Sequence, residues 1–188
     1  MKDSMIAMEQ VKIFDNFLDP YEFEEFKNKI FYPNEFGNID MEWQALPHVN
    51  SPDDEDGCFQ FVHLFYNEDT PSSNRIDYIL PIVRKIPNLL SVLRVKANLL
   101  TKTPEHVFHG YHVDVGPAQG LPHKTAIFYC NTTNGWTQFE DGTKVEGIAN
   151  RMVIFDGQLK HSSVSQTDEP FRVVVNFNYF EKAFIDET

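Results

Sequence analysis

The sequence has few of the features that mark secreted, membrane-spanning or nucleic-acid-binding proteins. Its 188 residues include only two cysteines, Cys58 and Cys130, without metal-type spacing, and no charged-then-apolar leader opens the chain. We therefore expect reduced cysteines and a cytoplasmic location. No apolar run approaches the roughly 18–20 residues that a membrane span requires. Sixteen Lys and Arg against 28 Asp and Glu leave a net charge of −12, which repels phosphate backbones and anionic lipid. We expect no membrane, DNA or RNA partner.

Aromatic residues are abundant instead, and they favour β-structure. The chain has 17 Phe, 7 Tyr and 2 Trp, and its second half alternates apolar and polar residues between turn signals. Eight strands are predicted there: Val92–Thr101, His106–Val115, Thr125–Asn131, Thr137–Glu140, Thr143–Glu146, Met152–Phe155, Ser162–Ser165 and Arg172–Phe180. Asp141-Gly142 predicts a tight primed turn between two of them. So many short strands predict a sandwich or barrel.

The first half of the chain predicts helices and supporting strands. Asp19 is a predicted N-cap followed by Pro20, and an amphipathic helix follows with Phe23, Phe26 and Ile30 on its apolar side. Beyond it we expect a strand at Cys58–Tyr66 and a helix over Ser73–Lys85 broken or kinked at Pro81. We expect one domain over residues 1–188, with 1–90 supporting a β-rich core at 91–181.

One short motif could ligate a metal ion. In a regular strand, the side chains of His112 and Asp114 in His112-Val113-Asp114 project from the same face. A third ligand would come from a distant strand, and His161 lies 47 positions beyond Asp114. Two His and one Asp suit a non-haem Fe(II) site with open positions. The alternative is coincidence, because any single histidine is more often a packed or surface residue.

The other histidines carry weaker signals. Because side chains alternate along a strand, His109 would project away from His112. His106 would lie on the same face as His112, six residues away. His123 follows a Gly/Pro loop, where we expect it to be solvated. His48 and His63 show no partner pattern.

Arg172 begins the last strand, 11 positions after His161. With period two, Arg172, Val174, Asn176 and Asn178 share one face, while the opposite face is entirely apolar or aromatic. A buried cation needs an anionic partner, because an unpaired one costs several kcal/mol. A carboxylate co-substrate would supply that partner through a bidentate contact. The alternative is a structural ion pair with an Asp or Glu.

In this order, the residues resemble the 2-oxoglutarate- and Fe(II)-dependent dioxygenases, specifically the short prolyl 4-hydroxylase-like branch. The resemblance covers Val92–Phe180 and includes Arg94–Leu99, Thr125–Asn131 and Gly135-Trp136-Thr137-Gln138-Phe139, which is similar to the family's Gly-Gly-x-Thr-x-Phe hairpin. It implies a double-stranded β-helix, a cupin-like jelly-roll, at 91–181 with flanking helices.

The resemblance also implies roles for individual residues. His112, Asp114 and His161 would hold Fe(II), and Arg172 would pair with the distal carboxylate of 2-oxoglutarate. Tyr129 would hydrogen-bond the same carboxylate, Asn98 would contact the co-substrate, and Asn178 would lie near the metal. Nucleic-acid demethylating relatives have an arginine where this chain has Asn178, which argues against DNA or RNA as substrate.

The implied reaction uses O2 and 2-oxoglutarate to hydroxylate an unactivated C–H bond, with ascorbate as an additional reductant. The substrate would be a prolyl or other protein side chain, or a free amino acid or small metabolite. Two further hypotheses stay open: a non-catalytic jelly-roll metal-binding module, and a cupin-like metal enzyme that does not use 2-oxoglutarate. The Ser51–Asp56 loop, the Cys58–Tyr66 strand and the Gly116–His123 segment are candidates for shaping a substrate groove.

Overall fold

The computed structural model describes residues 10–31, 41–50, 57–115 and 122–182. The acidic Ser51–Asp56 loop and most of the Gly116–His123 segment lie outside these residues, so their predicted roles at the groove stay predictions. Within the described residues, none of the helices combines the length and apolarity that a membrane crossing requires.

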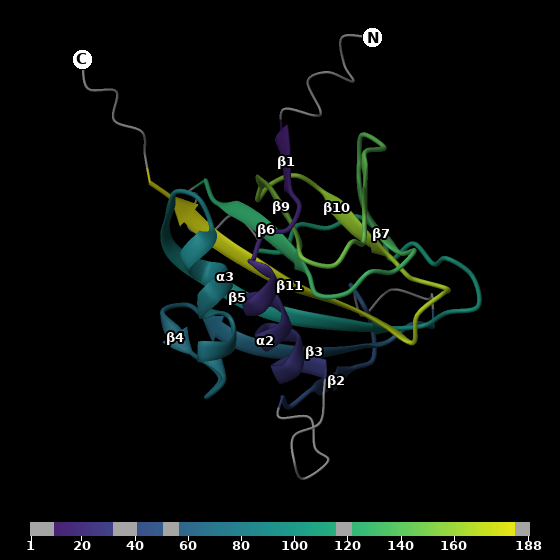
Figure 1. The fold of residues 1–188 in the computed structure, drawn as a ribbon. Coiled ribbons are helices and arrows are strands. Elements are labelled where there is room, and N and C mark those ends of the chain that lie inside the picture. The colour runs from purple at the N-terminus through teal and green to yellow at the C-terminus, as the bar shows by residue number, and fades with distance from the viewer. Residues whose placement is uncertain (1–9, 32–40, 51–56, 116–121, 183–188) are drawn as a thin grey trace.

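Two antiparallel sheets form the body of the described chain (Figure 1). The larger sheet runs in the order β1 (Val11–Phe14), β9 (Arg151–Asp156), β6 (Lys124–Tyr129), β11 (Phe171–Glu181), β5 (Leu89–Thr101), β3 (Gln60–Asn67) and β2 (Gln44–Leu46), with β4 (Thr70–Pro71) paired to β3. The smaller sheet has the order β10 (His161–Val164), β7 (Trp136–Phe139) and β8 (Lys144–Glu146). This is the jelly-roll predicted from the sequence.

Helix α2 (Pro20–Phe31) packs against one face of the larger sheet. Asp19 caps it, because its Oδ1 accepts hydrogen bonds from the backbone N–H groups of Tyr21 and Glu22. The predicted apolar side is confirmed: Phe23, Phe26 and Ile30 are all buried. The rings of Phe23 and Phe26 meet the Phe128 ring of β6 at centroid distances of 6.1 and 5.4 Å.

The helix predicted over Ser73–Lys85 forms as two pieces, but the break does not fall at Pro81. A 3-10 turn, η1 (Ile76–Tyr78), precedes helix α3 (Leu80–Lys85), and Pro81 lies in the first turn of α3. Proline is tolerated there because the first N–H groups of a helix have no intrahelical acceptor. Pro81 therefore helps to start the second helical piece, and the break comes before it.

Strand β11 divides the interior into two regions. Val173, Val175, Phe177 and Tyr179 face the core that the helices cover. On the opposite face, Arg172, Val174 and Asn176 line a cavity on the side where a second core contains Ile127, Tyr129 and Phe139. The alternation predicted from the sequence is confirmed. One face of the strand packs in the core under the helices, and the other carries polar side chains into the cavity.

The predicted strand His106–Val115 is wrong. The segment makes only two isolated bridges, Phe108 to Val164 and His112 to His161. Gly110 lies between them at φ +80°, a left-handed conformation that interrupts an extended strand. The parity argument applied to His109 and His106 therefore does not hold, since it assumes a regular strand.

The turn predicted at Asp141-Gly142 also differs in type. Gly142 has φ +88°, but Asp141 is not among the residues with positive φ. Phe139 N–H donates to Thr143 O at 2.8 Å and Gly142 N–H donates to Phe139 O at 2.9 Å. These features are typical of a three-residue loop ending in a glycine bulge. The primed geometry occurs instead between β3 and β4, where Glu68 and Asp69 have φ of 46° and 62°.

Candidate metal centre

His112, Asp114 and His161 converge at one point between the two sheets. His161 begins β10, and its backbone exchanges two hydrogen bonds with His112, N to O, each of 3.0 Å. Their imidazole centroids are 4.8 Å apart. The Nε2 atoms of His112 and His161 lie 3.8 and 4.0 Å from Asp114 Oδ1. All three candidate donor atoms fall within 4.8 Å of one another, which is the geometry of a group that could hold a metal ion.

Backbone carbonyls orient both imidazoles. His161 Nδ1 lies 3.1 Å from Leu159 O, and His112 Nδ1 lies 3.5 Å from Gly110 O. A proton on Nδ1 serves these contacts and leaves the Nε2 lone pairs directed toward Asp114. Two bare nitrogens facing a carboxylate repel it unless a proton or a cation lies between them. The donor set fits a divalent metal of the non-haem iron type.

The electrostatics of the cluster favour the protonation states that a metal requires. Burial lowers the pKa of His112 and the charge of a protonated His161 lowers it further, while Asp114 opposes the shift only partly. Burial would raise the pKa of Asp114, but the cationic forms of His161, Arg94 and His112 outweigh it, so its pKa falls below the ordinary value. A neutral imidazole and an ionised carboxylate are the ligating forms.

Three side chains hold Asp114 in place. Asn176 Nδ2 lies 3.1 and 3.0 Å from its two carboxylate oxygens, and Asn178 Nδ2 lies 3.4 Å from Oδ2. Arg94 lies 3.6 Å from Oδ1 and donates from Nε to Asn178 Oδ1 at 3.2 Å. Asn178 thus contacts one of the three residues predicted to hold the metal. Contacts of this kind fix the direction in which a ligating carboxylate points.

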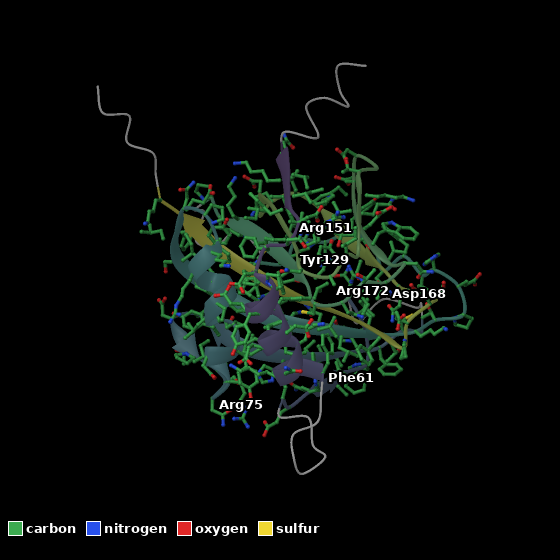
Figure 2. All side chains as sticks on the ribbon, viewed as in Figure 1. Phe61, Arg75, Tyr129, Arg151, Asp168 and Arg172 are labelled. Carbon is green, nitrogen blue, oxygen red and sulfur yellow. The ribbon has the colours of Figure 1, made fainter. Side chains whose placement is uncertain are left out.

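Arg172 is buried in the same interior, with 2 % of its surface exposed. Its NH2 group donates to Thr137 Oγ1 at 3.3 Å, and its guanidinium carbon lies 5.5 Å from the centroid of the Tyr129 ring. Figure 2 labels both Arg172 and Tyr129 within the fold. Within the described part of the chain, Arg172 has no carboxylate partner, and its Nε has no hydrogen-bond acceptor. The alternative of a structural ion pair therefore finds no support among these residues.

A single cavity joins the metal-type cluster to Arg172. His112, Asp114 and His161 line it together with Arg172, and its remaining lining consists of Val49, Gln60, Lys96, Asn98, Leu100, Ile127, Thr137, Ser163, Val174 and Asn176. Asn98 is among these lining residues, and its predicted contact with the co-substrate stays a prediction. Tyr129 is set back from this lining, and its hydroxyl donates to Thr137 Oγ1 at 2.7 Å. Burial raises the pKa of Tyr129, so the phenol is neutral.

The remaining histidines lie away from the cluster. His106 contacts Ser165 O through Nδ1 at 2.7 Å, and His109 lines a different cavity. His123 is buried, with 1 % of its surface exposed, so the prediction that it is solvated is wrong. It packs on Gly157, where a Cβ atom would lie 2.3 Å from the imidazole.

Sequence reasoning missed three residues of the site: Thr137, Asn176 as a support for Asp114, and Lys96. Thr137 appears in the sequence only as part of a hairpin motif, and its position between Tyr129 and Arg172 depends on the meeting of β7 with the larger sheet. The one available signal for Asn176 and Lys96 is the polarity of two otherwise apolar strands.

No protein-family model matches the chain, and no curated protein matches it by sequence. Solved structures do match it. A Pseudomonas putida prolyl-4-hydroxylase is 13% identical with a TM-score of 0.61, over 92% of this chain and 93% of that one. A 2OG-Fe(II) oxygenase family oxidoreductase from Burkholderia pseudomallei is 10% identical with a TM-score of 0.63, over 94% and 88%.

HygX from Streptomyces hygroscopicus, solved with nickel, 2-oxoglutarate and hygromycin B, is 12% identical with a TM-score of 0.55, over 99% of this chain and 89% of that one. At these identities the matches establish the fold. The fold is the jelly-roll of the 2-oxoglutarate- and Fe(II)-dependent oxygenases, with a prolyl 4-hydroxylase among the structures that share it.

Proposed function

We propose that the protein is an Fe(II)- and 2-oxoglutarate-dependent dioxygenase that hydroxylates an unactivated C–H bond. The observation that carries this proposal is Arg172, a buried cation with no acidic partner in the described chain, in the cavity that His112, Asp114 and His161 also line. A metal-binding cluster alone fits many activities. Three candidate metal ligands and a buried guanidinium in the same cavity fit a co-substrate that is both a metal chelator and a dicarboxylate.

His112 and His161 would bind Fe(II) through Nε2 and Asp114 through a carboxylate oxygen. When bound, the metal would supply the oxidising power for a reaction in which O2 and 2-oxoglutarate give succinate and CO2, with one oxygen atom entering succinate and the other a C–H bond of the substrate. The chain's own part is to keep the ligands deprotonated and oriented. The amides of Asn176 and Asn178 do this for Asp114, and the two backbone carbonyls do it for the imidazoles.

Arg172 would hold the distal carboxylate of 2-oxoglutarate through two parallel N–H donors. Thr137 bonds both Arg172 and the Tyr129 hydroxyl, which sets the guanidinium in position. Tyr129 would act on the same carboxylate through this hydroxyl network, and Asn98 would contact the co-substrate from β5. Apolar lining residues such as Ile127, Leu100 and Val174 limit the access of water to the reacting atoms.

Two classes of substrate fit this site: a protein side chain such as a prolyl residue, and a free amino acid or small metabolite. Among the structures that share the fold, one is a prolyl-4-hydroxylase and another has the small molecule hygromycin B bound. A nucleic-acid substrate is disfavoured by the net charge of −12. In addition, position 178 is an asparagine engaged with Asp114 and Thr125 rather than an arginine.

The competing hypotheses make different predictions about Arg172. A non-catalytic module gains nothing from a buried, unpaired guanidinium, which destabilises the fold. A cupin-like enzyme that does not use 2-oxoglutarate has no dicarboxylate for it to hold. The co-substrate accounts for its burial directly, because binding supplies the missing charge.

The test is a titration of 2-oxoglutarate into the Mn²⁺-loaded protein without oxygen, followed by measurement of succinate release from the Fe(II)-loaded protein in air. We expect saturable binding and slow succinate release that both require the metal. His161→Ala should abolish metal binding and succinate release together, whereas His63→Gln should change neither. A wild-type protein that binds the metal but not 2-oxoglutarate would overturn the proposal.

A further inference from the structure

Lys96 lines the cavity at the end where Asp114 lies. It belongs to β5, where it stands directly opposite Asn176 of β11 and Leu64 of β3. Asn176 is the residue whose amide contacts both oxygens of Asp114. Lys96 is therefore a lining residue whose place on the strand is next to the support of Asp114, nearer the candidate metal ligands than Arg172 is.

Among the described residues, Lys96 feels the charge of Asp114 but makes no close contact with it, whereas the neighbouring cation does. Arg94 lies two positions away on the same strand and contacts both Asp114 and Asn178. Lys96 makes neither a hydrogen bond nor an ion pair with any described residue. Burial lowers the pKa of Lys96, because removing an ammonium group from water disfavours its charged form; the charge of Arg94 lowers it further, and Asp114 opposes the shift only partly. An anion bound beside it would offset this loss of hydration.

The charges that line the cavity leave room for one more anion. The charged lining residues, counting histidine as neutral, are Lys96, Arg172 and Asp114. A divalent metal and the two carboxylates of 2-oxoglutarate cancel each other, and the single charge of Asp114 is shared with Arg94, which contacts it from outside the lining. At least one positive charge therefore remains in the occupied site. The chain as a whole has a net charge of −12, so this local cation is unlike the average surface.

Lys96 and Arg172 stand at different positions along the lining. Arg172 stands opposite Leu100, four residues from Lys96 on β5, which corresponds to roughly 13 Å along the strand. Arg172 has 2 % of its surface exposed, whereas Leu64, the cross-strand neighbour of Lys96, is 37 % exposed. The sheet is therefore more open to solvent near Lys96 than near Arg172.

We propose that Lys96 binds a carboxylate of the primary substrate, so that the substrate is an organic acid whose carboxylate lies beside the metal cluster. This inference rests on the proposed function and narrows its substrate class. A free amino acid or another small carboxylic acid fits it. A neutral prolyl side chain within a peptide does not, unless an acidic residue accompanies it.

The test uses paired acids and amides as probes on the protein loaded with Mn²⁺ and 2-oxoglutarate without oxygen. The pairs are propionate with propionamide, benzoate with benzamide, and L-proline with L-prolinamide. We expect at least one acid to bind about tenfold or more tightly than its amide, measured by calorimetry or by the shift in thermal unfolding temperature. Lys96→Met should remove this preference, and Lys96→Gln provides a second variant should the first fail to fold.

Lys102→Met is the matched control. Lys102 is an exposed lysine just beyond the end of β5 whose Nζ donates to Asp168 O, and its loss should leave the preference for acids intact. Equal binding of acids and amides to the wild type, or a preference that survives in Lys96→Met, would overturn the inference. Absence of measurable acid binding would count against it in the same way.

A measurement of 2-oxoglutarate affinity separates the two sources of carboxylate. Binding of 2-oxoglutarate should be equal within about threefold in the wild type and in Lys96→Met. A loss of tenfold or more would show that Lys96 holds the co-substrate's own metal-side carboxylate, which overturns the inference but leaves the proposed function standing. A wild type that does not bind 2-oxoglutarate overturns the proposed function, and this inference with it.

Discussion

The side-chain amide of Asn176 lies about equally far from both carboxylate oxygens of Asp114, at 3.1 and 3.0 Å. Asn176 belongs to the long central strand β11, whereas Asp114 follows a segment with only isolated bridges. A side chain of the central strand thus positions Asp114, whose own segment is not paired in a regular strand. Asn178 and Arg94 add contacts to the same carboxylate, so the position of Asp114 depends on the larger sheet.

Replacing Asn176 should therefore weaken metal binding without removing a ligand. We expect Asn176→Ala to lower the affinity for Mn²⁺ by about 10- to 100-fold, the usual effect of losing a residue that orients a metal ligand. Asn131→Ala is the control: Asn131 bonds the backbone of Phe171 and Val173 on the same strand but lies outside the cavity lining. A metal titration of the two variants is decisive, and equal affinities would show that Asn176 does not support Asp114.

Arg172→Met should act in opposite directions on stability and on co-substrate binding. Removing a buried cation without an acidic partner should leave the free energy of unfolding of the ligand-free protein unchanged or higher. Affinity for 2-oxoglutarate should fall by roughly 2–5 kcal/mol, or about 30-fold to several thousand-fold. Chemical denaturation and calorimetry measure the two effects separately. A variant that unfolds more easily yet binds 2-oxoglutarate normally would assign Arg172 a structural role.

Several features of this site could be predicted from the sequence because they depend on local periodicity. The alternation along Arg172–Phe180 places Arg172 and Asn176 on one face, and the structure confirms it. The motif His112-x-Asp114 brings two donors together even though the segment is not the regular strand that was assumed. Two residues that are two positions apart stay close in space even where the backbone is irregular.

Other features could not be predicted because they depend on which strands become neighbours. Lys96 is relevant to the site only because β5 pairs with β11 in the register that places it opposite Asn176. Nothing in the composition near residue 96 encodes that register. The burial of His123 likewise depends on Gly157, a residue of a distant turn whose missing side chain makes room for the imidazole. Local composition predicts a solvated histidine, and tertiary packing decides otherwise.

Gly135 provides a steric test of the arrangement around Arg172. A Cβ atom at this position would lie 2.7 Å from the backbone oxygen of Val164 and 3.1 Å from Cδ of Arg172. We expect Gly135→Ala to destabilise the fold by about 1–3 kcal/mol and to weaken 2-oxoglutarate binding, because the added methyl group displaces the guanidinium.

Gly142→Ala is the matched control for this substitution. A Cβ atom added at Gly142 would meet open space, but φ there is +88°, so alanine is strained without contacting the site. It should cost about 1–2 kcal/mol of stability and leave 2-oxoglutarate affinity unchanged. If the two variants lose affinity equally, the effect of Gly135→Ala comes from general destabilisation and not from Arg172.

His112 should stay available as a metal ligand to lower pH than an ordinary histidine. A protonated imidazole cannot ligate, so affinity falls once His112 takes up a proton. Burial, together with the charge of a protonated His161, lowers the pKa of His112, so in the folded protein it stays neutral below the ordinary value of about 6.5. Because the unfolded chain binds that proton more readily, the contribution of His112 to stability is complete above pH of about 6.5 and is lost as pH falls through its lower, folded-state pKa. Mn²⁺ titrations from pH 8 to 5 should give a midpoint below about 6.5, and the same midpoint in His63→Gln, whose imidazole contacts Glu42 and Ser73 instead. A midpoint above that value would contradict the shielded environment assigned to His112.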